Sequence, residues 1–226
     1  MNLQKRFWQV FLLAFLWFSP VLLHGEESIE ELRKKAEQGD AKAQYNLGGA
    51  YECGSGVPKD KVQSVNWYRK AAEQGHAEAQ WFLGMSYEFG SGVVKNEAEA
   101  LRWYRRSAEQ AHSGGQMALA DCYARGTGGV VKNDEEAANW YSKAAEQGSA
   151  VAQIALSSCY ANGLGVIKND TLAYKWMLLA VAYGGSTAKE KISIIEARLN
   201  PEQRAEGQRL ATEWQAAFDK KKKESE

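Results

Sequence analysis

The sequence predicts an all-α fold: a right-handed α/α superhelical solenoid of helix-turn-helix repeats with a C-terminal capping helix. Two observations carry this prediction. One pattern returns about every 36 residues, and each copy contains two stretches in which apolar residues have helical spacing. The pattern is marked by tryptophans separated by 36, 37 and 36 residues: Trp67, Trp103, Trp140 and Trp176. A fixed period of this length indicates units that bury their apolar faces by stacking on their neighbours.

The first helix of each copy is visible as an apolar stripe that ends at glycine. In the first copy, Ala43, Leu47 and Tyr51 are spaced four residues apart, which places them on one side of a helix. This helix is expected to end at Gly54, because glycine readily adopts the left-handed conformation that closes a helix. Val57 follows, and we expect it to fill the gap between the two helices.

The second helix of each copy begins with a capping residue. Asp60 is followed three residues later by Gln63, and the next two copies contain Asn96 with Glu99 and Asn133 with Glu136. This spacing is that of a capping box, in which each of the two residues accepts a hydrogen bond from the backbone N–H of the other. The last copy has Asn169 followed by Leu172, so we expect its cap to be the weakest.

These signals divide the chain into segments. We expect a signal peptide at 1–25, a half-repeat helix at 26–39, four repeats at about 40–75, 76–111, 112–148 and 149–184, capping helices at 185–219, and a disordered tail at 220–226. The signal peptide is predicted from Lys5 and Arg6, which precede an apolar run, with Gly25 as a plausible cleavage point. The alternative is an uncleaved membrane anchor.

Composition and charge exclude several classes of protein. The chain is 45% hydrophobic and 25% charged, which is typical of folded soluble proteins. Lysine plus arginine equals aspartate plus glutamate at 28 each, so charge gives no reason to expect nucleic-acid binding.

The sequence contains no recognisable catalytic, cofactor or metal site. The glycine pairs follow helices, so they are interpreted as turns and not as phosphate-binding loops. His76 and His112 occupy the same repeat position, too far apart to share a metal ion, and are expected to be solvated residues between helices. We expect no disulfide among Cys53, Cys122 and Cys159.

The repeated residues resemble those of a known family. Each copy combines Ala, Gln, Leu and Tyr positions with Gly-x-Gly-Val and a segment related to Trp-Tyr-x-Lys-Ala-Ala-Glu-Gln-Gly. From about Ile29 to Gly184 the chain is similar to the Sel-one-like repeat family, a branch of the tetratricopeptide-type solenoids. The segment from Pro201 to Trp214 also resembles the end cap of bacterial members. The resemblance implies an α/α superhelix that acts as an adaptor for protein complexes, often in exported proteins.

Candidate partner-binding residues come from positions that differ between copies. In this architecture the first helices line the concave side. Phe82 and Met85, one helical turn apart, are candidate apolar anchors for a peptide, and Asn46 and Asp121 are candidate polar contacts. Ser158 completes the set of groove residues. The alternative is that the adjacent repeat or a terminal helix covers Phe82 and Met85.

The function that the sequence favours is an exported, non-enzymatic scaffold, periplasmic or secreted, that binds a protein or peptide in its concave groove. It is expected to need no cofactor or metal and to bind neither nucleic acid nor, after cleavage, a membrane. One alternative is a membrane-tethered periplasmic assembly factor. A second is a protein that binds or hydrolyses cell-wall fragments or β-lactams.

Overall fold

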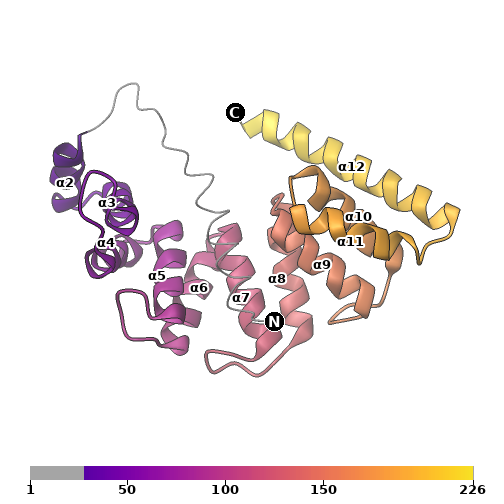
Figure 1. The fold of residues 1–226 in the computed structure, drawn as a ribbon, viewed down its shortest axis with the longest axis horizontal. Coiled ribbons are helices and arrows are strands. Elements are labelled where there is room, and N and C mark those ends of the chain that lie inside the picture. The colour runs from indigo at the N-terminus through magenta and orange to yellow at the C-terminus, as the bar shows by residue number, and fades with distance from the viewer. Residues whose placement is uncertain (1–27, 226) are drawn as a thin grey trace.

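The computed structural model describes residues 28–225, so the expected signal peptide at 1–25 lies outside the described residues. Within this range the regular structure is entirely α-helical. The helices are α2 (Ile29–Glu37), α3 (Ala41–Cys53), α4 (Lys61–Glu73), α5 (Ala77–Phe89), α6 (Glu97–Glu109), α7 (Ser113–Arg125), α8 (Asp134–Glu146), α9 (Ala150–Asn162), α10 (Asp170–Ala182), α11 (Ser186–Glu196) and α12 (Pro201–Ser225). Figure 1 shows them in order along an arch, with α2 at one end and α10 to α12 at the other.

Each repeat is a pair of 13-residue helices, as the sequence predicts. We call α3, α5, α7 and α9 the first helices, and α4, α6, α8 and α10 the second helices. Every first helix ends at a glycine in the left-handed conformation: Gly54, Gly90, Gly126 and Gly163. The helix α2 packs on α3 and serves as the second helix of an incomplete repeat.

A second glycine in the turn is required by the contact between successive repeats. At Gly92, with φ of +72°, an added Cβ would collide with the backbone carbonyl of Lys61, which lies at the start of α4 in the preceding repeat. Gly165 lies equally close to the carbonyl of Asp134, at the start of α8. The loop of each of these repeats therefore rests directly on the preceding repeat. Val57 in the first loop is buried, as expected.

The second-helix caps are present, but the capping-box prediction is half wrong. The Asp60 side chain accepts hydrogen bonds from the backbone N–H groups of Val62 and Gln63. The Asp60 N–H, however, donates to the carbonyl of Tyr51 at 2.9 Å and not to the Gln63 side chain. Because the preceding helix already supplies an acceptor, the reciprocal bond of the box is replaced. The Asn169 side chain accepts from one amide where the caps of the other three accept from two.

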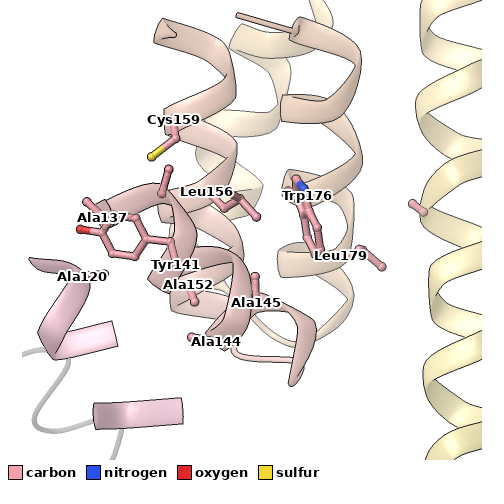
Figure 2. Packing of buried hydrophobic residues seen from close by; sticks show 12 residues of the cluster. Ala120, Ala137, Tyr141, Ala144, Ala145, Ala152, Leu156, Cys159, Trp176 and Leu179 are labelled. Atoms are coloured by element: carbon pink, nitrogen blue, oxygen red, sulfur yellow. The ribbon is translucent and has the colours of Figure 1, made fainter. Parts of the chain in front are cut away.

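The core lies between helices of neighbouring repeats. Figure 2 shows Tyr141 of α8, Leu156 of α9 and Trp176 of α10 around Ala144 and Ala145, whose small side chains let the helices approach closely. A lysine or arginine lies against each repeat tryptophan, as at Trp140, where Lys143 Nζ is 3.7 Å from the ring centroid.

Buried glutamines connect the repeats through a second set of contacts. Gln80 is 4% exposed; its Nε2 donates to the carbonyl of Ala72, and its Oε1 accepts from Gln110 Nε2 at 2.7 Å. Gln44 with Gln74 and Gln116 with Gln147 form the same pair. The last repeat has Tyr183 at the partner position. Consequently the buried Oε1 of Gln153 accepts no hydrogen bond from any described residue.

The C-terminal helices close the array, and α12 is longer than expected. Its start has a reciprocal capping box between Asn200 and Gln203. Its Trp214 packs on Trp176 and Tyr183 of the last repeat. The prediction of a disordered tail at 220–226 is wrong as far as Ser225, because the helix continues to that residue. The tail contains no glycine or proline, and lysine and glutamate favour helices.

Candidate interaction surface on the first helices

The predicted partner-binding residues lie on one side of the first helices, which we call the first-helix face. It comprises Asn46, Phe82, Met85, Asp121 and Ser158 together with their neighbours on α3, α5, α7 and α9. None of these five side chains is fully buried: Asn46 is exposed and the other four are half-buried. The structure does not gather them into one cluster but into two groups, one apolar and one polar.

The apolar group is centred on α5. The ring of Phe82 stacks on that of Tyr68, with centroids 5.1 Å apart and planes inclined by 15°. It also lies 5.9 Å from the ring of Tyr45 on α3 and 4.8 Å from that of Trp81. Met85 packs against the cluster that contains Tyr104 and Leu119. The adjacent repeats therefore cover part of Phe82 and Met85 while leaving both partly accessible.

The polar group joins the second and third repeats. The Tyr104 hydroxyl donates to Glu88 Oε2 at 2.7 Å, and Arg125 Nη2 donates to Glu88 Oε1 at 3.0 Å. The Tyr141 hydroxyl donates to Asp121 Oδ1 at 2.5 Å. Burial raises the pKa of the Asp121 carboxyl, although its hydrogen bond with Tyr141 acts in the opposite direction. Burial, followed by the charge of Glu88, raises the pKa of Tyr104. The Glu88 and Asp121 carboxylates are therefore already engaged in hydrogen bonds within the protein.

Asn46 and Ser158 lie outside both groups. Asn46 is the exposed residue beside Tyr45 on α3. The Ser158 hydroxyl donates to the backbone carbonyl of Ile154 at 3.0 Å, so its hydrogen is used within α9. Four further residues of the face were not predicted from the sequence, because the candidate positions were taken only three residues apart: Tyr45, Trp81, Glu88 and Arg125. The neighbouring aromatic positions and the residue before the helix-closing glycine would have revealed them.

The two histidines are helix caps and not solvated residues. His76 and His112 are half-buried N-caps, and their Nδ1 atoms accept hydrogen bonds from the backbone N–H groups of Ala79 and Gly115. Other repeats use Asp40 or Ser149 at this position. Burial lowers the pKa of His112, the nearby Glu78 raises it and His76 lowers it. The expectation of solvation was wrong because side-chain acceptors are needed at these helix starts.

Other kinds of site have little support in the described part of the chain. Residues 28–225 contain no group of three or more His, Cys, Asp or Glu side chains placed to hold a metal ion. No helix in the same range combines the length and apolar character needed to span a membrane. A shallow depression beside α2 includes Arg33, Tyr51 and Asp60, but the Arg33 guanidinium already donates to the Tyr51 hydroxyl and Asp60 caps α4. Cys53 is exposed, Cys122 and Cys159 are buried, and all three are free thiols.

The stacked helix pairs and the open face define an α/α repeat scaffold. The Sel1 repeat model matches residues 41–76, 77–112, 113–149 and 150–182, so the chain belongs to the Sel1 repeat family. Sel1 repeats generally mediate protein interactions, and proteins built from them are generally non-catalytic scaffolds.

Solved structures of similar proteins agree with this assignment. A Sel1 repeat protein from Oxalobacter formigenes is 39% identical, with a TM-score of 0.70, over 80% of this chain and 74% of that one. The protein c5321, described as a protective antigen of uropathogenic Escherichia coli with an SLR fold, is 28% identical, with a TM-score of 0.57. That match covers 85% of this chain and 50% of c5321. The immunity protein Pa5087 from Pseudomonas aeruginosa shares the fold, with a TM-score of 0.51. It is 22% identical over 97% of this chain and 83% of that one. No curated protein gave a match.

Proposed function

We propose that this protein is an exported, non-enzymatic scaffold that binds a protein or peptide along the concave groove formed by its first helices. The observation that carries the proposal is the partly accessible apolar group of Tyr45, Trp81, Phe82 and Met85 on α3 and α5. Aromatic and methionine side chains that remain partly exposed are typical anchors for a partner. The general role of Sel1 repeats in protein interactions supports the same conclusion.

Peptide capture tests this function. A display library of random dodecapeptides would be selected on the purified protein, and the selected peptides measured on a Phe82→Ala, Met85→Ala double variant. We expect at least a tenfold loss of affinity, because anchor residues commonly contribute about 2 kcal/mol or more. The matched control is Val94→Ala, Ile167→Ala, which removes apolar surface from two loop residues that are 88% and 91% exposed. Equal affinity for the two double variants, at unchanged helicity, would remove Phe82 and Met85 from the binding site.

Export is proposed from the N-terminal sequence. Lys5 and Arg6 followed by an apolar run favour a cleaved leader, which places the mature protein in the periplasm or outside the cell. The intact mass of protein isolated from its native source tests this, since cleavage after Gly25 removes the first 25 residues. Retention of the full mass in the membrane fraction would favour the tethered assembly factor instead.

A further inference from the structure

The second and third repeats contain a carboxylate that accepts hydrogen bonds from two side chains, a tyrosine and an arginine. Glu88 lies at the next-to-last position of α5, where its side chain is 14% exposed. It accepts one hydrogen bond from the Tyr104 hydroxyl of α6 and one from the Arg125 guanidinium at the end of α7. A half-buried carboxylate is thus neutralised by an arginine from the following repeat, which offsets the cost of removing the charge from water.

The first and second repeats contain the equivalent carboxylate and tyrosine, but the position equivalent to the arginine holds an uncharged residue. The equivalents of Glu88 and Tyr104 are Glu52 and Tyr68, so the carboxylate and the tyrosine are both retained. The equivalent of Arg125 is Phe89, which is 46% exposed at the end of α5. Glu52 is half-buried and forms no ion pair with any residue in 28–225.

The charge of Glu52 acts on its surroundings. The pKa of the Cys53 thiol is raised first by burial and then by the Glu52 carboxylate, while the nearby Lys59 lowers it. The pKa of Tyr68 is raised by burial, by Tyr45 and then by Glu52. The negative charge therefore lies close to Tyr68 and the aromatic group around Phe82, on the face to which the partner is assigned.

We propose that the partner of the groove supplies this cation: a peptide segment in which an arginine or lysine pairs with Glu52 next to an apolar side chain that packs on Phe82 and Met85. The inference rests on the proposed function and specifies the chemistry of its ligand. The charged group takes the place beside Glu52 that Arg125 occupies beside Glu88.

The charge of the surrounding face agrees with a basic segment. Among the described residues, the carboxylates Glu52, Glu88 and Asp121 outnumber the cations Lys42 and Arg125 on this face, and Arg125 is already paired with Glu88. The excess of negative charge attracts a basic peptide and disfavours an acidic one. The apolar group supplies the contact area, and Glu52 selects which peptides can use it.

The test uses peptides selected on the unmodified protein from the same random library. The selected sequences are expected to share an arginine or lysine at a fixed distance from an apolar residue. Affinities are then measured for one such peptide and for a copy with citrulline, which keeps the shape of arginine without its charge. Glu52→Gln is expected to weaken the arginine peptide about tenfold and the citrulline peptide little, the range for a charge-assisted hydrogen bond.

Two further variants separate the charge effect from structural damage. Phe89→Arg copies Arg125 into the second repeat, and we expect it to reduce binding of the arginine peptide because the new guanidinium competes for Glu52. Glu73→Gln removes an exposed carboxylate from α4 and is expected to leave binding unchanged. Added salt should weaken the arginine peptide more than the citrulline peptide.

The possible outcomes test the basic-peptide inference separately from the proposed peptide-binding function. Peptides that require Phe82 and Met85 but carry no shared basic residue, or bind Glu52→Gln equally with arginine and citrulline, overturn the inference and leave the groove function intact. Failure to select any peptide that requires Phe82 and Met85 overturns both.

Discussion

Leu83 and Phe82 are adjacent on α5, yet they belong to two regions that follow different rules. Leu83 is fully buried, and its equivalents in the other repeats are also leucine: Leu47, Leu119 and Leu156. Phe82 is half-exposed, and its equivalents are Asn46, Ala118 and Ala155. An interior position meets nearly the same neighbours in every repeat, so the same residue fits each time. The position of Phe82 also meets a repeated neighbour, Tyr68 or its equivalent tyrosine, but its other side is open. Its residue type can therefore differ between repeats and can serve a partner that contacts one repeat only.

The largest effect on stability is expected from the interior tryptophans. Trp103 is 6% exposed, so Trp103→Ala should lower the free energy of unfolding by about 3–5 kcal/mol. Trp67 occupies the same repeat position but is half-buried, and Trp67→Ala should cost less. Urea-induced unfolding followed by circular dichroism measures both. Equal losses would show that burial does not decide the cost at this position.

The contact between successive repeats gives the next effect. Gly54 and Gly92 both have positive φ, so alanine at either position costs about 1–2 kcal/mol from the left-handed conformation. A Cβ at Gly54 meets ordinary contacts of 3.4 Å, whereas at Gly92 it overlaps the Lys61 carbonyl. Gly92→Ala should therefore cost about 1–3 kcal/mol more than Gly54→Ala. Similar melting temperatures for the two variants would contradict the close packing of loop on helix.

The glutamine pairs predict that replacing an exposed glutamine destabilises the protein, because its partner is a buried glutamine. Gln110 is exposed, and exposed substitutions usually change stability by less than about 0.5 kcal/mol. Gln110→Ala, however, leaves the buried Oε1 of Gln80 without its partner, which should cost about 1–3 kcal/mol. Gln38 is the equivalent exposed residue directly after α2, and Gln38→Ala serves as the control in the same unfolding experiment. A Gln110→Ala variant as stable as this control would show that the pair contributes nothing.

The smallest effect is a dependence on pH at the edge of the first-helix face. Burial lowers the folded-state pKa of His112 below its ordinary value of 6.5, so the unfolded chain binds the proton more readily. Stability should therefore be complete above about pH 6.5 and decline as the pH falls through the unfolded pKa toward the lower folded one. Because protonation of Nδ1 also removes the cap acceptor, a loss of about 0.5–2 kcal/mol is expected.

The residue at the same position in the fourth repeat supplies the control for this pH effect. His112→Ser keeps a cap like that of Ser149 and removes the titrating group. Thermal melting between about pH 5 and pH 8 should show a smaller decline for this variant than for the native protein. An identical decline in both would assign the pH dependence to other groups.

The sequence predicted the helix pairs because their signals are local. The apolar stripe through Leu47 and Tyr51, the glycine stop at Gly54 and the cap at Asp60 each depend on residues within one turn or one loop. The histidine caps were missed because histidine is an uncommon capping residue. The predicted site residues lie on one side of the first helices because of their spacing, and their binding role stays a prediction.

By itself, the sequence determined the period, the helix boundaries within the four repeats and the identity of the buried stripe, because backbone hydrogen bonding and apolar spacing act over a few residues. Only the tertiary structure decided which repeats touch and what each contact needs. The Tyr51 carbonyl replaces half of a capping box, Tyr183 leaves the Oε1 atom of Gln153 without a donor among residues 28–225, and Phe89 occupies the position equivalent to that of Arg125. These outcomes depend on distances between atoms that lie a whole repeat apart in the chain, and such distances are set by packing.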